Sequence, residues 1–160
     1  MKQNEQEFTT LVRKQRAAIY SVCYMFADSI DEASDLFQEV LVNLWRGFET
    51  FRGDSSPNTW VYRVSLNTCL TFDRKKKRRR KMHEEVEIDP SLLDGHTDMG
   101  AQSRLLHERI GQLEPFDRAI VLLWLEDMSY DDIGAIVGIS SKAVGVRLVR
   151  IREKLKSLGR

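Results

Sequence analysis

The sequence is short of the residues that break helices, cross-link chains or bind metals. Its 160 residues include only three prolines, two cysteines and three histidines, which leaves long stretches free to form uninterrupted helices. Both cysteines, Cys23 and Cys69, fall within helical patterns, which favours a reduced pair in the core over a redox switch. The histidines match no zinc-ligand spacing, so we expect no metal, no cofactor and three solvent-exposed side chains, His83, His96 and His107.

Long hydrophobic runs are also absent. The longest, Ala119–Leu125, is far shorter than the roughly 20 apolar residues that a membrane-spanning helix needs. The first residues, MKQNEQEF, are polar and unlike the apolar centre of a signal peptide. We therefore expect a soluble, cytoplasmic protein with no membrane insertion.

Charge is unevenly distributed although the net charge is only +1. Residues 1–81 carry a net charge of +5, residues 82–103 of −6, residues 104–132 of −4 and residues 133–160 of +6. Two basic regions separated by an acidic middle indicate two contacts on one polyanion.

The N-terminal half has the periodicity of helices and no strand pattern. It predicts helices over 5–27 and 31–48, and a third helix with Ser56 as its N-cap and Pro57 at its first position. Trp45 and Phe48 lie on the wide apolar face of the second helix and are expected to anchor the core.

The opposite face of the 31–48 helix is polar and charged with one isolated valine. It is either an ordinary solvated face or a strip on which another protein docks, and the residues alone favour neither interpretation. This face consists of Asp35, Gln38, Glu39, Val42 and Arg46.

The third predicted helix ends in eight consecutive basic residues, 74–81. Such a run cannot be buried without partners, so it is either a solvated tail or a segment that binds phosphates. A polar loop, 53–58, and an aromatic residue, Trp60, precede it. This combination favours binding of single-stranded nucleic acid.

Residues 82–103 are acidic and nearly aperiodic, and they predict a flexible linker between a domain at 1–81 and one at 104–160. Fully extended, this linker would span roughly 70 Å, so the flanking domains need not touch. The last segment predicts four helices. The expected class is therefore all-α, with an N-terminal domain of three to four helices and a C-terminal domain of four.

The stretch from Ser129 to Lys156 predicts a helix-turn-helix. Ser129 is placed to cap a short helix, Gly138 to end it, and Ser140 to cap a second helix. The second helix has one narrow apolar stripe, Val144, Leu148, Ile151, Leu155 and Leu158. A basic helix after a glycine turn favours DNA binding in the major groove over a plain helical hairpin.

Together these segments resemble the extracytoplasmic-function class of bacterial RNA polymerase σ factors. The resemblance is carried by DEASDLFQEVLVNLWRGFETFRG, NTWVYRVSLN and LEPFDRAIVLLWLEDMSYDDIGAIVGISSKAVGVRLVRIREKLK, in that order. It implies a promoter-specificity subunit that is not an enzyme. It also implies binding to the β′ clamp coiled coil and the β flap of core polymerase, to promoter DNA and to an anti-σ factor.

The resemblance also implies roles for particular residues. The strip Asp35, Gln38, Glu39, Val42 and Arg46 would contact core polymerase. The −10 element and its melting would involve Asp54, Ser55, Ser56, Asn58, Trp60, Arg63, Asn67, Arg74, Lys75 and Arg78. The −35 element would be read by Ser140, Ser141, Lys142, Val146, Arg147 and Arg150.

Three positions depart from the family pattern. Gly134 stands where a small residue such as alanine is usual, and Gly145 and Val146 replace a basic and a small polar residue in the recognition helix. Base readout would then depend on apolar contact with thymine methyl groups, on DNA shape and on Arg150.

Two other classes of protein are compatible with parts of the pattern. A helix-turn-helix regulator that acts without core polymerase would form a homodimer on a palindromic site, whereas a σ factor would be a monomer when free. A site-specific recombinase would need a nucleophile within an α/β domain, for which the helical N-terminal half gives no support.

Overall fold

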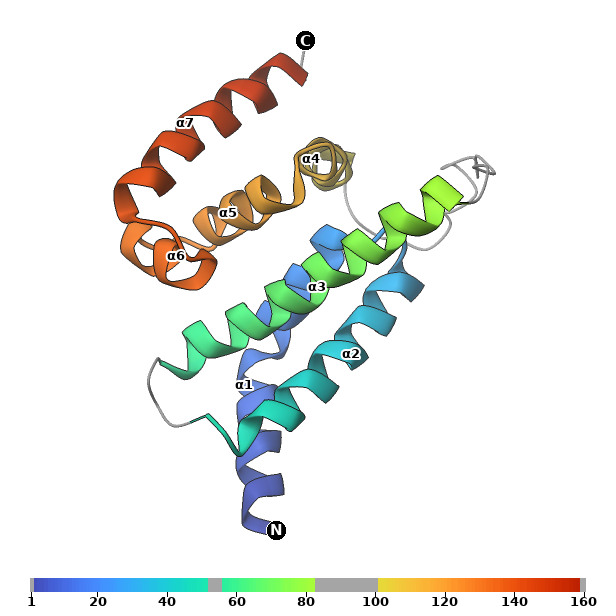
Figure 1. The fold of residues 1–160 in the computed structure, drawn as a ribbon, viewed down its shortest axis with the longest axis vertical. Coiled ribbons are helices and arrows are strands. Elements are labelled where there is room, and N and C mark those ends of the chain that lie inside the picture. Colours follow the sequence, from blue (N-terminus) through green and yellow to red (C-terminus); the bar gives the residue numbers. More distant parts are fainter. Residues whose placement is uncertain (1, 52–55, 83–100, 159–160) are drawn as a thin grey trace.

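The fold is entirely helical over the residues that the computed structural model describes, which are 2–51, 56–82 and 101–158. The prediction of an all-α protein is therefore confirmed, and Figure 1 shows the order of the helices. Their bounds are α1 Lys2–Phe26, α2 Ile30–Phe48, α3 Pro57–Met82, α4 Ala101–Gly111, α5 Pro115–Leu125, α6 Tyr130–Val137 and α7 Ser141–Leu158.

The N-terminal domain is a bundle of α1, α2 and α3, each of which contacts the other two. Its core contains Cys23 and Cys69, which are free thiols and fully buried, as predicted. A hydrogen bond with Cys23, together with burial, raises the pKa of the Cys69 thiol. A thiol held in its protonated form is a poor nucleophile, so the pair serves packing.

The prediction that Trp45 anchors this core is wrong. Its side chain is 43% exposed and packs edge-on against Phe8, with ring centroids 5.1 Å apart. Phe48 is half-buried and also contacts Phe8, at 5.5 Å. The first turns of α1 lie at this end of α2 (Figure 1), and Phe8 covers one side of the Trp45 ring.

The C-terminal domain consists of α4 to α7, and its helix caps agree with the predicted helix-turn-helix. The Asp132 backbone N–H donates to the Ser129 hydroxyl at 3.1 Å, and Gly138 ends α6 with a left-handed φ of 84°. The Ala143 N–H donates to Ser140 at 3.1 Å. The apolar stripe of α7 is buried from Val144 to Ile151, whereas Leu158 is exposed.

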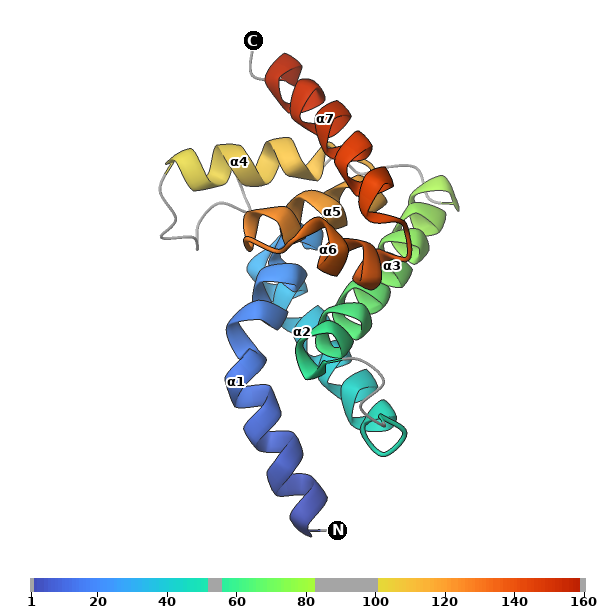
Figure 2. The ribbon, with the colours of Figure 1, turned by 90° about the vertical axis from the view of Figure 1, so that its left-hand side faces the viewer.

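The two domains pack against each other. Helix α3 lies against α5 and α6, and α1 lies against α4 and α5, as Figure 2 shows from the side. The sequence did not predict whether the two domains would touch. It also makes the prediction for His107 wrong, because the ring is half-buried with Nε2 2.9 Å from the Tyr24 carbonyl oxygen of the other domain.

Gly134 is explained by the turn that follows α6. Gly138 and Ile139 both donate their backbone N–H groups to the Gly134 carbonyl, at 2.8 and 3.1 Å. This draws the chain back so closely that a Cβ at position 134 would lie 2.4 Å from the Ile139 carbonyl oxygen. The helix-turn-helix therefore requires glycine here, at a cost in helix propensity of up to about 1 kcal/mol.

We expect Gly134→Ala to lower the free energy of unfolding by about 1–3 kcal/mol, because the new methyl group meets backbone that cannot move aside. Urea denaturation followed by circular dichroism measures the change. Gly145→Ala is the matched control, since its Cβ would lie 3.4 Å from the Tyr130 ring, an ordinary contact, and should be neutral or stabilising. Equal stability of the two variants would contradict the turn-based explanation.

Candidate functional site

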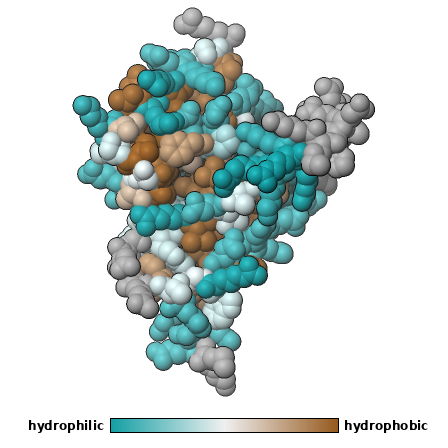
Figure 3. Space-filling model, viewed as in Figure 1, coloured by the Kyte–Doolittle hydropathy of each residue, from teal (hydrophilic) through white to brown (hydrophobic). Residues whose placement is uncertain are grey.

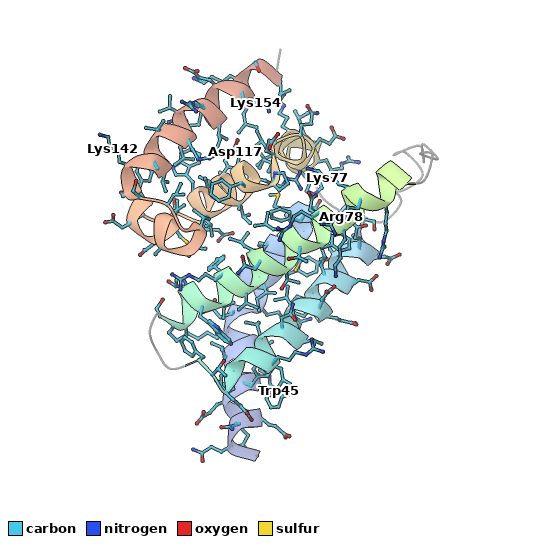
Figure 4. The ribbon with its side chains drawn as sticks, in the orientation of Figure 1. Trp45, Lys77, Arg78, Asp117, Lys142 and Lys154 are labelled. Carbon is cyan, nitrogen blue, oxygen red and sulfur yellow. The ribbon has the colours of Figure 1, made fainter. Side chains whose placement is uncertain are left out.

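The polar face of α2 is open to solvent along its length. All five side chains predicted to form a docking strip are exposed, and Val42 is 47% exposed at the middle of the strip. Sequence reasoning missed Trp45, whose exposed ring (labelled in Figure 4) adds a second large apolar group on the same helix. We call Asp35, Gln38, Glu39, Val42 and Arg46 the α2 strip.

The loop between α2 and α3 is described only at its two ends. Asp54 and Ser55 lie outside the described residues. Ser56 caps α3 as predicted, by accepting a hydrogen bond from the Thr59 backbone N–H at 3.1 Å. Trp60 stacks on Phe51 with ring centroids 4.7 Å apart. This stacked pair fixes an aromatic surface at the base of the loop, beside the exposed Asn58.

The outer face of α3 is polar from residue 63 to residue 79, and Figure 3 shows hydrophilic side chains along it. The structure exposes the predicted DNA-binding residues Arg63, Asn67, Arg74, Lys75 and Arg78. These side chains form one row along the axis of α3, in which each residue rises by about 1.5 Å.

Lys76 is an exception in the basic run, which we expected to be wholly solvated or bound to phosphates. Its ammonium group is partly buried and pairs with Asp28 and, at 2.8 Å, with Glu32. These carboxylates lie at the turn between α1 and α2, so Lys76 fastens the C-terminal half of α3 to its own domain. The exposed cations on either side are thereby held on a fixed helix.

The recognition helix α7 presents a mixed basic and apolar face. Lys142, Val146 and Arg150 are exposed as predicted, and Lys142 projects outward at the start of the helix (Figure 4). Sequence reasoning missed Val149, which is 60% exposed. Its spacing of seven residues from Lys142 and three from Val146 places it on the same helix face and could have identified it.

Arg147, also predicted to read DNA, has partners within its own domain. Its Nη1 atom lies 3.1 Å from Asp117 Oδ1, and its guanidinium lies 4.7 Å above the Phe116 ring. Both partners belong to the first turn of α5. These contacts turn Arg147 toward α5, whereas neither Lys142 nor Arg150 has an ion pair among the residues that the structure describes.

A cleft of about 320 Å³ separates the two domains near the ends of α1 and α4. It is lined by both signs of charge, including Asp73, Lys77, Arg118 and Lys154. Lys77 lies 3.6 Å from Asp73, and Figure 4 shows Lys77 and Lys154 on the two sides of the gap.

Neither a membrane-spanning helix nor a metal-binding group emerges from the residues that the structure describes. None of the described helices is long and apolar enough to cross a bilayer. No cluster of three or more metal-ligating His, Cys, Asp or Glu side chains occurs in these segments.

Comparison with known proteins agrees with this arrangement. Residues 11–79 match the model of sigma-70 region 2, and residues 103–155 match that of sigma-70 region 4. The chain is 28% identical over 165 residues to the RNA polymerase sigma-H factor of Pseudomonas aeruginosa, which covers 95% of this chain and 86% of the relative. It is 26% identical over 170 residues to the ECF RNA polymerase sigma factor SigW of Bacillus subtilis, with 97% and 90% covered.

The fold is also shared with a solved structure. The sigma factor RpoE of Bartonella quintana, in complex with the anti-sigma factor NepR, superposes with a TM-score of 0.71 at 22% identity, over 99% of this chain and 97% of that one. The two sigma-70 models together cover most of the sequence, in the order region 2 and then region 4. The chain therefore belongs to the extracytoplasmic-function (ECF) group of RNA polymerase sigma factors, non-catalytic subunits that direct promoter recognition.

Proposed function

We propose that this chain is a monomeric, dissociable sigma factor whose domains, 1–81 and 104–160, grip the −10 and −35 elements while the α2 strip holds core polymerase. The observation that carries the proposal is the placement of three exposed faces rich in charged side chains on α2, α3 and α7, each separate from the apolar stripe that packs its helix. A subunit that bridges an enzyme and two DNA sites needs three separate surfaces of this kind.

In this proposal α7 reads the −35 element from the major groove. Lys142 and Arg150 supply donors to bases or phosphates. The capping residue Ser140 and the first helical residue Ser141 lie at the end of the helix that enters the groove. Val146 and Val149 present methyl groups, which pack favourably on the thymine methyl and cannot hydrogen-bond a guanine. Arg147 leaves its ion pair with Asp117 and neutralises a phosphate of the DNA instead.

The −10 element is bound by the loop and face of α3. Ser56 and Asn58 lie beside the stacked Phe51–Trp60 pair, which offers an unstacked base an aromatic neighbour. Arg63 and Asn67 contact the strand at the point of opening, and Arg74, Lys75 and Arg78 neutralise phosphates. A trapped base favours strand separation, so melting uses binding energy and no nucleotide hydrolysis.

The similarity to a solved sigma factor also supports regulation by a partner protein. The RpoE of Bartonella quintana was solved with its anti-sigma factor, and we propose that an anti-sigma factor also binds this chain. Binding to the β′ clamp coiled coil through the α2 strip, and to the β flap through the C-terminal domain, places its action in the cytoplasm, where promoter DNA is transcribed.

Run-off transcription tests the function directly. Core polymerase with this chain should give a discrete transcript from templates carrying its promoter, found by mapping start sites after overexpression, and core polymerase alone should give none. Failure to obtain any specific transcript from the mapped promoters would overturn the proposal.

The α2 strip is tested by the double variant Gln38→Ala and Glu39→Ala. We expect its Kd for core polymerase to rise about tenfold, equal to roughly 1.4 kcal/mol, with unchanged thermal unfolding because both side chains are exposed. Ser34→Ala, an exposed change on α2 outside the strip, is the matched control. Unchanged affinity of the double variant would exclude this docking surface.

The phosphate contacts are tested by salt dependence. Arg78→Ala should reduce the slope of log K against log salt for holoenzyme binding to promoter DNA by about 0.7–0.9, the value for one lost phosphate contact. Lys76→Gln is the comparison, since its ammonium group is already paired within the protein, and it should leave the slope unchanged. The reverse ranking would show that Arg78 is not at the phosphates.

A further inference from the structure

The cations predicted to bind DNA differ in the acceptors that they already have within the protein. Arg63 donates to a neutral group, the Ala135 carbonyl oxygen, at 3.1 and 2.6 Å. Arg147 instead donates to the carboxylate of Asp117. A carbonyl group leaves the positive charge of its partner intact, whereas a carboxylate largely cancels it as seen from a distance. Among the described residues with a predicted DNA contact, Arg147 is therefore the cation whose charge is offset by an ion pair.

The carboxylate of this pair is fixed by the helix that carries it. Asp117 lies in the first turn of α5, where the helix dipole favours a negative charge. The preceding residue, Phe116, is half-buried against the core, and its ring lies 4.7 Å from the Arg147 guanidinium. The residues that follow, 118–123, are buried, so this turn keeps its place when Arg147 moves. Figure 4 shows Asp117 on the side of α5 that faces α7.

The pair is nevertheless open to exchange. Only the Nη1 group of Arg147 donates to Asp117, at 3.1 Å, and its Nε and Nη2 groups have no acceptor among the described residues. The Arg147 side chain is 45% exposed and the Asp117 side chain 25%. Ion pairs with this degree of exposure are weak because water and salt screen them. A phosphate that approaches the exposed side of Arg147 can therefore replace the carboxylate.

Such an exchange leaves a negative charge beside the DNA. When Arg147 binds a phosphate, Asp117 remains on α5 without its cation. One side chain reaches both acceptors, so the carboxylate stays close to the phosphate, and charges closer than a Debye length are incompletely screened. The attraction that Arg147 gains from the phosphate is thus offset by the pair that it gives up and by the repulsion that remains.

We propose that Asp117 is a positioning residue that limits the grip of α7 on duplex DNA, by competing with phosphate for Arg147. This inference rests on the proposed contact between α7 and the −35 element. A sigma subunit has to release that element when polymerase moves away from the promoter. Affinity differences among variants of one interface arise mostly in the dissociation rate. Asp117 therefore shortens the lifetime of the −35 contact and favours release.

Removal of the carboxylate charge tests the competition. For holoenzyme on a duplex that carries the mapped promoter, Asp117→Asn should lower the Kd about three- to fivefold at low salt and slow dissociation by a similar factor. Arg147 then binds phosphate without giving up a charged partner. The gain should shrink as the salt concentration rises, because it is electrostatic.

Two further variants are the controls for this measurement. Asp117→Glu keeps the charge and should bind promoter DNA as the wild type does. Glu108→Gln removes the same charge from an exposed position on α4, away from Arg147 in the list of ion pairs of the described residues. It should change the Kd less than about twofold, since it affects only the net charge.

A double-mutant cycle with Arg147→Gln identifies the partner. In the wild-type background this change should weaken promoter binding less than about twofold, because the lost phosphate contact is offset by the ion pair that no longer has to break. In the Asp117→Asn background the same change should weaken binding about fivefold. A merely structural role for Asp117 would not couple the two positions in a salt-dependent way.

Weaker promoter binding by Asp117→Asn would show that the carboxylate supports the Arg147 contact, and equal effects of Arg147→Gln in both backgrounds would show that the two residues act independently. Either result overturns the inference. The same variants of the free full-length chain on a duplex of unrelated sequence need neither polymerase nor promoter. Specific transcription without any effect of Asp117 refutes the competition alone. Tighter binding of Asp117→Asn to the unrelated duplex, with no transcript from the mapped promoters, supports the competition and refutes the proposed function.

Discussion

The C-terminal turn of α1 is the place on which both domains depend. Phe26 and Ala27 are buried there, between the bundle of α2 and α3 and the helices α4 and α5 that α1 also contacts. A domain of this size buries only a modest fraction of its surface, so apolar area shared between two domains matters to each. The cation of Arg118 above Phe26 adds attraction to this apolar contact.

The local elements could be predicted because their signals are local. Ser56, Ser129 and Ser140 accept the capping hydrogen bonds, and Gly138 adopts the left-handed conformation that follows from its place after an apolar stripe. The position of Trp45 could not be predicted, because helical periodicity assigns a face but not how far a neighbouring helix extends along it. His107 was misjudged for a related reason, since its partner Tyr24 lies 83 positions earlier in the chain.

The functional faces also divide into features that the local sequence predicts and features that depend on contacts between helices. Exposure of the α2 strip and of α7 follows from helix periodicity, and Val149 would have been found by applying that periodicity more completely. The partners of Arg63, Lys76 and Arg147 lie on other helices and required the packed structure. A count of basic residues does not distinguish these three from Arg78, although Arg63, Lys76 and Arg147 each already bind an acceptor within the protein.

The close return of the chain from Ile139 to Gly134 also bears on attempts to re-target the protein. The position of α7 is set by a turn whose backbone leaves no room for a side chain at position 134. A chimera that exchanges α7 alone would join a foreign helix to a turn with its own geometry. Transplanted promoter specificity should therefore include residues 134–139 as a single cassette, so that the grafted helix keeps the angle at which it meets the groove.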